Sequence, residues 1–330
     1  MGGFPARARS WWPRPPAPST GAGRLLLVVP AALAGVALAW LLATPDGPDP
    51  AATVRVLSDL LGSTVLGLCV LDRLQHGERR PVVARSALWR PIAVAAGCWA
   101  LTEFTLLVAA ASEVAAGPLT PTALARFVGG ISVGQLGAAT TLAAAGTAIV
   151  SAAAFRRSET AWPVTPFAAV AAVALLARPV TGHMSTQVLG SVLVAAHVLG
   201  AALWLGPLVA MALLLRGRGA WATLLPRYSD LAWKCVAVLT VTGVVDAAVA
   251  LGGIGALVDT GYSRILLAKA VALAGLVALG WWWRRGWVPA ATAHRVTAES
   301  SLRRAVAEVV ALAVVFGLAA ALATTGLSAP

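Results

Sequence analysis

The sequence predicts an all-α membrane protein, a polytopic bundle of about nine transmembrane helices. Of its 330 residues, 59% are hydrophobic and only 12% are charged, and the mean hydropathy is +0.82. Soluble domains average about 45–50% and about 25% on these two counts, so this chain has too little polar surface to cover a soluble globule. The apolar stretches are long and continuous and do not alternate with period two, which argues against a β-barrel.

Nine apolar segments are long enough to cross a bilayer, which takes roughly 20 residues. They cover, in chain order, residues 24–43, 53–71, 90–111, 127–154, 162–178, 187–215, 232–252, 262–283 and 305–325. The first is longer than the apolar run of a signal peptide, so we interpret it as an uncleaved first helix. We divide the chain into a disordered basic cytoplasmic tail (1–23), a five-helix membrane region (24–178) and a four-helix membrane domain (179–330).

The distribution of basic residues predicts the orientation of these helices. With the N-terminus in the cytoplasm and nine crossings, 20 of the 25 Lys and Arg residues fall in cytoplasmic segments. Basic residues accumulate on the cytoplasmic side of membrane proteins, so we expect the N-terminus inside and the C-terminus outside. The five exceptions are Arg55, Arg126, Arg178, Arg264 and Lys269. The net charge of +12 then reflects topology and attraction to anionic lipid, and we expect no nucleic-acid partner.

Several other function classes lack support in the sequence. The extracytoplasmic loops are too short for an enzyme domain, and no Ser/His/Asp or metal-hydrolase spacing occurs, so we expect no enzyme. Cys69, Cys98 and Cys235 lie in or beside apolar runs without a CxxC spacing, which argues against a disulfide framework. We find no internal repeat of the kind that builds inverted-repeat transporters.

Ionisable residues inside the predicted spans are functional candidates, because each costs roughly 2.5–3.5 kcal/mol on insertion scales. Counting 1.5 Å per residue from the helix ends places Glu103, His197, Asp246 and Lys269 in one layer of the outer half of the membrane. We predict that Lys269 forms an ion pair with Asp246 or Glu103, since an unpaired charge there would be costly. A purely structural role for these charges is the alternative.

The sixth predicted span carries the residues that point most directly to a metal. His183 and Met184 lie at its outer mouth, and His197 follows His183 by fourteen residues. Imidazole nitrogen and thioether sulfur suit copper, whereas Mg²⁺ and Ca²⁺ sites need more oxygen ligands than this chain offers. We therefore predict copper ligands at His183, Met184 and His197, with a structural hydrogen-bonding role for His197 as the alternative.

Weaker candidates for the same path lie nearer the expected inner end. Trp204 and Met211 follow His197 at intervals of seven residues, which keeps them on nearly one helix face. Methionine at this spacing is more often a packing residue, and we expect that role for Met211. Glu308 in the last span follows Arg304 by four residues, and a surface ion pair between the two explains its position.

From residue 180 onward the sequence resembles the copper resistance protein D (CopD) family of bacterial inner-membrane proteins. The matching stretches are Gly182-His183, His197 with Trp204-Leu205-Gly206, Arg227-Tyr228-Ser229-Asp230-Leu231-Ala232, Thr242-Gly243 with Asp246, Tyr262-Ser263-Arg264-Ile265-Leu266-Leu267-Ala268-Lys269, and Arg303-Arg304 with Glu308. Their order and spacing fit over about 150 residues, whereas residues 1–160 carry no part of the resemblance.

The resemblance implies a role in copper transport or copper tolerance at the bacterial plasma membrane. It makes His183 and His197 the best-matched ligands, and copper ion the bound or transported species. Some relatives carry a fused periplasmic copper-binding domain, so we expect a separate periplasmic donor protein here. The chain departs from the family pattern at Ser263 and Pro207, where glycine is expected, and at Asp246, where asparagine is frequent.

Two further functions compete with copper import. One is a non-transporting factor that delivers copper to a respiratory oxidase or another partner. The other is electron transfer through b-type haem, which needs two facing histidines where this chain offers one deep in a span. The residues leave open the direction of transport and the choice between Cu(I) and Cu(II).

Overall fold

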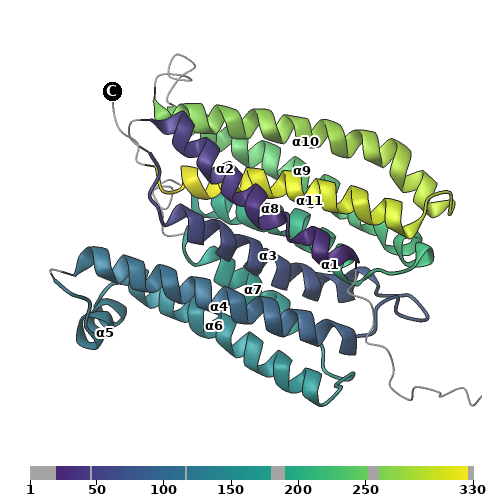
Figure 1. Ribbon diagram of the computed structural model, residues 1–330, viewed down its shortest axis with the longest axis horizontal. Coiled ribbons are helices and arrows are strands. Elements are labelled where there is room, and N and C mark those ends of the chain that lie inside the picture. Colours follow the sequence, from purple (N-terminus) through teal and green to yellow (C-terminus); the bar gives the residue numbers. More distant parts are fainter. Residues whose placement is uncertain (1–19, 45–46, 116, 180–189, 252–259, 326–330) are drawn as a thin grey trace, which may run out of the picture.

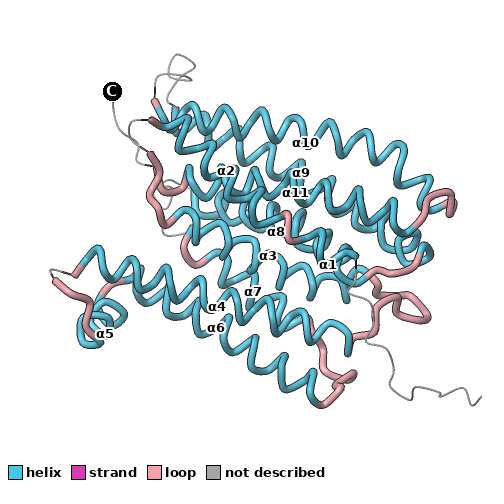
Figure 2. Tube along the Cα trace, in the orientation of Figure 1, coloured by secondary structure: helices cyan, strands magenta, loops and turns pink. Residues whose placement is uncertain are grey.

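The computed structural model describes residues 20–44, 47–115, 117–179, 190–251 and 260–325, and within these ranges the chain is helical without strands (Figures 1 and 2). The helices are α1 (Thr20–Leu25), α2 (Val28–Ala43), α3 (Ala52–Leu74), α4 (Ser86–Val114), α5 (Pro121–Gly130), α6 (Ser132–Arg156), α7 (Thr165–Leu176), α8 (Gly190–Leu214), α9 (Arg218–Leu251), α10 (Gly261–Thr292) and α11 (Ala298–Leu322). The predicted all-α membrane bundle is confirmed.

Eight of the described helices are long and apolar enough to cross a membrane, and α7 is the exception among the nine predicted spans. It has 12 residues, about 18 Å of helix, where the sequence predicted a span over 162–178. Pro179 follows soon after its last turn and has no backbone N–H with which to continue a helix. The apolar composition was right, but the helix is too short to cross alone.

Another difference lies at the start of the predicted fourth span. Residues 127–130 belong to a separate short helix, α5, and the spanning helix α6 begins only at Ser132. Thr120 caps α5 by accepting a hydrogen bond from the Ala123 backbone N–H at 3.1 Å, with Pro121 in the first helical position. The capping threonine and the proline are both strong signals for the start of a helix. Ile131, in an extended conformation, separates α5 from α6.

Contacts between helix termini identify the two ends of the bundle. At the arginine-rich end, which the sequence places in the cytoplasm, Arg24 pairs with the first turn of α11 at 2.5 Å. At the same end Arg227 donates to the Leu74 carbonyl oxygen at 2.7 Å. At the opposite end, which the sequence places outside the cytoplasm, Arg264 of α10 donates to the Thr44 carbonyl oxygen just beyond α2 at 3.2 Å. Figure 1 shows that α2 and α10 meet at this end of the bundle. Segments that are far apart in the sequence therefore lie side by side at each end of the bundle.

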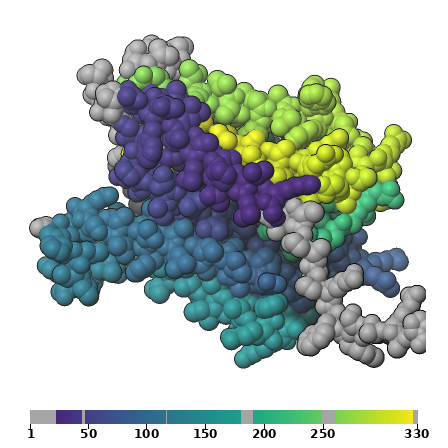
Figure 3. Space-filling model, viewed as in Figure 1, coloured from purple at the N-terminus to yellow at the C-terminus, as the bar shows by residue number. Residues whose placement is uncertain are grey.

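Close helix contacts are made through glycine. The central helix α3 packs against α4, α7, α8 and α11, and it meets α8 where Gly67 faces Gly206. A Cβ atom on either glycine would overlap the backbone of the other helix. Gly35 of α2 and Gly317 of α11 form the same kind of contact, and Figure 3 shows α2 lying directly against α11. Small residues allow this approach of membrane helices, where packing replaces the hydrophobic effect.

The topology predicts where a reporter enzyme works. A reporter active only in the cytoplasm should be active when fused after residues 80, 157, 220 or 290, and inactive after 48, 118, 182 or 258. Activity is measured in cells that express each fusion to the same level. A reversal after residue 182 would show that the segment containing α7 does not bring the chain to the outer side.

The glycine contact between α3 and α8 predicts a selective loss of stability. Gly67→Ala should lower the thermal unfolding temperature of the purified protein, because overpacking a close contact costs about 1–3 kcal/mol. Gly146→Ala is the matched control, since Gly146 lies inside α6 with nothing within 4 Å of an added Cβ. Equal stability of the two variants would contradict the close contact.

Candidate functional site

His197 of α8 is held in place by a threonine of α9. Its Nδ1 atom lies 2.8 Å from Thr242 Oγ1. The Thr242 hydroxyl is also 2.8 Å from the Val238 carbonyl oxygen, to which it donates its single proton. This geometry favours a threonine oxygen that accepts from Nδ1–H, and hence the neutral tautomer with its proton on Nδ1. The Nε2 lone pair is left to bind a cation, the arrangement in which protein histidines ligate metals.

Asp246 and Lys269 lie beside this histidine. Asp246 follows Thr242 by one turn of α9, and its buried Oδ1 atom has no hydrogen-bond partner among the described residues. Lys269 of α10 lies close enough for its charge to act on both Asp246 and His197. The site thus combines an imidazole nitrogen and a carboxylate oxygen, neither with a hydrogen-bond partner among the described residues, with a nearby ammonium group.

The expected ion pair of Lys269 is not formed. Within the described part of the chain no ion pair joins Lys269 to Asp246 or to Glu103. Glu103 pairs with Arg178 instead, across 2.5 Å. Asp246 remains the electrostatic neighbour of Lys269 without direct contact. The predicted ion pair with Asp246 or Glu103 is therefore absent among the described residues, and Asp246 is near enough only for its charge to act on Lys269.

Glu103 belongs to a separate polar cluster between α3, α4 and the end of α7. Its side chain is buried, with 5% of its surface exposed. One carboxylate oxygen accepts from the Ser58 hydroxyl and the other from Arg178, while Trp99 Nε1 donates to Ser58 Oγ at 3.1 Å. The sequence analysis placed Arg178 in an outer loop, but α7 is short. Its Phe167 lies against Trp89 near the arginine-rich end of α4, so Arg178 reaches the level of Glu103.

A cavity of about 300 Å³ lies next to this cluster, toward the end of the bundle that the sequence places outside the cytoplasm. Its charged lining residues are Arg55, Arg178, Asp49 and Glu113. Asp59 of α3, which the sequence analysis passed over, lies within electrostatic reach of Arg55, Glu103 and Arg178. Its signal was available, since it is an acidic residue inside the predicted span 53–71, but Glu103 and Arg178 lie in other segments.

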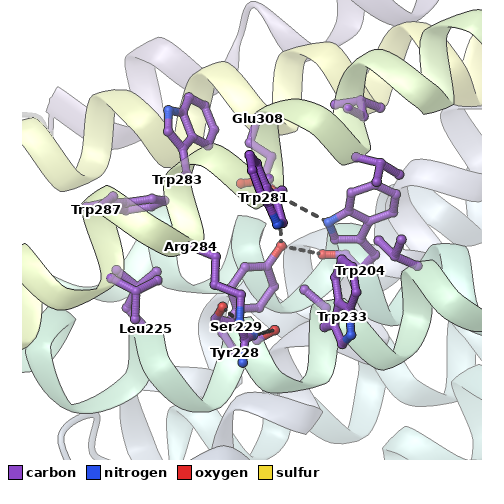
Figure 4. Close-up of a pocket in the computed structure, with 16 residues that line it drawn as sticks. Trp204, Leu225, Tyr228, Ser229, Trp233, Trp281, Trp283, Arg284, Trp287 and Glu308 are labelled. Atoms are coloured by element: carbon purple, nitrogen blue, oxygen red, sulfur yellow. Dashed lines mark hydrogen bonds between the residues drawn. The ribbon is translucent and has the colours of Figure 1, made fainter.

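Glu308 is buried and hydrogen-bonded, which corrects the prediction of a surface ion pair. Only 7% of its surface is exposed, and no ion pair joins it to Arg304 in the described ranges. Its Oε1 atom accepts from Trp204 Nε1 at 3.0 Å and from the Tyr228 hydroxyl at 3.4 Å (Figure 4). The face of α11 that carries Glu308 is turned toward α8 and α9, so spacing along one helix did not decide its partner.

The remaining predicted candidates fall in two groups. His183 and Met184 lie outside the described residues. Met211 is completely buried in the core, and Trp204 is buried as the donor to Glu308. In the part of the chain that the structure describes, no group of three or more His, Cys, Asp or Glu residues is arranged to hold a metal ion.

Two family comparisons cover most of the chain. Residues 222–322 match the copper resistance protein D family, and residues 46–191 match the copper resistance protein D-like N-terminal domain. The chain belongs to the copper resistance protein D family. Comparison with curated proteins and with solved structures found no match.

Most residues of the polar clusters described above lie within the two ranges of this copper resistance protein D family member that match the family. The N-terminal match contains Glu103 and Arg178, and the C-terminal match contains Thr242, Asp246 and Glu308. His197 lies in the stretch of α8 between the two matched ranges. The resemblance seen after residue 180 therefore extends to the first half of the chain, where the sequence analysis had found none.

The Glu103 cluster predicts a charge-specific effect on stability. Glu103→Gln should lower the thermal unfolding temperature, because Arg178 then loses its carboxylate partner in a buried setting. Removing one partner of a buried pair costs about 3–5 kcal/mol, and the 23% exposure of the Arg178 side chain places the effect toward the lower end. Glu113→Gln, at an exposed carboxylate of the same helix, is the control. Identical melting curves would contradict the pairing.

Proposed function

We propose that this protein moves copper ions across the bacterial plasma membrane, along the contact between α8 and α9, with His197 as the ligand inside the membrane. The observation that carries the proposal is the orientation of His197, whose Nδ1 is bonded to Thr242 while Nε2 has no partner among the described residues. Membership of the copper resistance protein D family supports copper as the cation. The protein would act by binding and moving the ion, without covalent chemistry.

Asp246 and Lys269 give this site a way to balance charge. A copper ion at His197 Nε2 brings positive charge into the membrane, where charge without compensation is costly. The unpartnered Asp246 Oδ1 supplies the opposing charge, one helical turn from Thr242. In the absence of copper, the Lys269 ammonium would replace the copper ion as the positive charge that acts on Asp246. Copper and the lysine charge would then alternate at the same carboxylate.

The route below His197 is closed in this conformation. Trp204, Leu205 and Met211 of α8 are all buried by neighbouring helices. Passage therefore requires α8 to move against its neighbours, and Pro207 provides a point for this movement. A proline lacks the N–H that would bond the carbonyl four residues earlier, so the helix is weakest around Leu203.

The closed inner half also favours a second candidate, a factor that binds copper from the outer side and delivers it without transport. The unpartnered donor atoms lie in the outer half, and the packed residues lie below them. In either case copper would come from a separate donor protein on the outer side. Entry of copper into sealed vesicles separates the two functions, because only a transporter fills the lumen.

The test is copper uptake by proteoliposomes that contain the purified protein. His197→Ala should abolish uptake with normal expression, because alanine can neither ligate copper nor hydrogen-bond. Thr242→Val keeps the shape of the side chain but removes the acceptor for Nδ1–H, and loss of such a supporting contact typically costs about 10–100-fold in metal affinity. His294→Ala, in the connection between α10 and α11, should transport like the wild type.

Other outcomes of the uptake experiment would contradict the role of His197 as a copper ligand. Normal uptake by a well-folded His197→Ala variant would contradict the proposed ligand. Normal uptake combined with poor expression would make His197 a structural residue. His183→Ala should weaken uptake at low copper and be partly rescued at high copper, as expected for a residue at the mouth of the path.

A further inference from the structure

Glu308 is a buried carboxyl group without a cationic partner in the described part of the chain. Its hydrogen-bond partners are two neutral groups, the Trp204 indole N–H at 3.0 Å and, more weakly, the Tyr228 hydroxyl at 3.4 Å, whose single proton is shared with the Trp204 carbonyl oxygen at 3.1 Å. Arg304 lies one turn away on the same helix, but no ion pair with it occurs in the described residues. The two donors stabilise the ionised carboxylate, whereas burial without a countercharge opposes it. A carboxyl group under such opposing effects is suited to binding and releasing a proton.

The other charged groups around Glu308 leave it without compensation. On α9, Cys235 lies two turns from Tyr228. On α10, Arg284 lines the same cavity as Glu308, but the Arg284 side chain is exposed. Helix α2 carries no titratable residue between Val28 and Ala43. The charged residues of α3 lie toward its two ends, at Arg55, Asp59, Asp72 and Arg73.

A small cavity connects Glu308 with the arginine-rich surface. It has a volume of about 50 Å³, which is room for more than one water molecule. Tryptophans from three helices form much of its wall, and Figure 4 shows them around the Tyr228 hydroxyl and Glu308. Ser229 and Arg284 also line it. The Arg284 side chain is exposed and pairs with exposed Asp230 at 2.7 Å, so the cavity extends from a buried carboxyl to the expected cytoplasmic surface.

We propose that Glu308 is a proton-binding site that exchanges protons with the cytoplasmic side through water in this cavity. A proton from cytoplasmic water adds to a Glu308 carboxylate oxygen to give the neutral acid, and the reverse step returns it. Protonation removes the charge that strengthens the hydrogen bonds from Trp204 and Tyr228, which join α11 to α8 and α9. The ionised group therefore holds the three helices together, and the protonated group loosens them.

This proton site is placed where it can act on the copper path. Trp204 lies seven residues from His197 on nearly the same face of α8, about 10 Å along the helix. Loosening of the Trp204 contact would release the part of α8 that closes the path below His197. This coupling rests on the proposed transport function, whereas binding of the proton does not.

The proton site is tested by infrared difference spectroscopy of the copper-free protein in lipid as the pH is changed. The wild type should show a protonated-carboxyl band that appears and disappears with pH. Glu308→Gln should lose this band, because the amide keeps an oxygen acceptor for Trp204 but cannot exchange a proton. Glu299→Gln, at an exposed residue in the first turn of α11, should keep it. A pH-dependent band unchanged in Glu308→Gln would overturn the inference.

Two additional measurements keep the test decisive. If Glu308→Gln fails to fold, Trp204→Phe should move the band to higher pH, since it removes the indole N–H that donates to the carboxylate at 3.0 Å; an unmoved band would count against the site. In proteoliposomes with a trapped pH dye, copper uptake by the wild type should be accompanied by proton movement that falls at least tenfold in Glu308→Gln. A wild type that takes up no copper would reject the proposed function while the infrared result still decides the proton site.

Discussion

A polar side chain inside a bilayer must find its partner within the protein, because hydrocarbon offers none. This requirement accounts for the three polar clusters of the bundle. Glu103 is satisfied by Ser58 and Arg178, His197 by Thr242, and Glu308 by Trp204 and Tyr228, with the two sides of each cluster on different helices. Each cluster is thus a functional candidate and also a lock between helices.

The helix packing brings these groups within bonding distance. Glycine pairs at the α3–α8 and α2–α11 contacts allow backbones to touch, and the short α7 ends where Arg178 can reach Glu103. At the α8–α9 contact, Asp246 Oδ1 has no hydrogen-bond partner among the described residues, while Trp204 and Met211 are buried in the inner half. A closed inner half is one state of the cycle that copper transport would need.

The hydrophobic pattern and the arginine distribution were enough to predict the bundle and the spans of most helices, because both depend on composition within one segment. Partners between segments could not be predicted in this way. The spacing of Arg304 and Glu308 indicated a surface pair, yet the rotation of α11 in the bundle turns Glu308 toward α8 and α9. Arg178 was assigned to a loop, because nothing in its own segment shows that α7 ends at the depth of a glutamate on α4.

The account depends most on the protonation of His197, which solid-state NMR of protein labelled with ¹⁵N-histidine in lipid bilayers measures directly. We predict that the signal lost in His197→Ala is that of a neutral ring with its proton on Nδ1, as the Thr242 contact requires. Adding Cu(I) should then shift the Nε2 resonance and leave Nδ1 protonated. A proton on Nε2, or a ring unaffected by copper, would contradict the assignment of His197 as the intramembrane copper ligand.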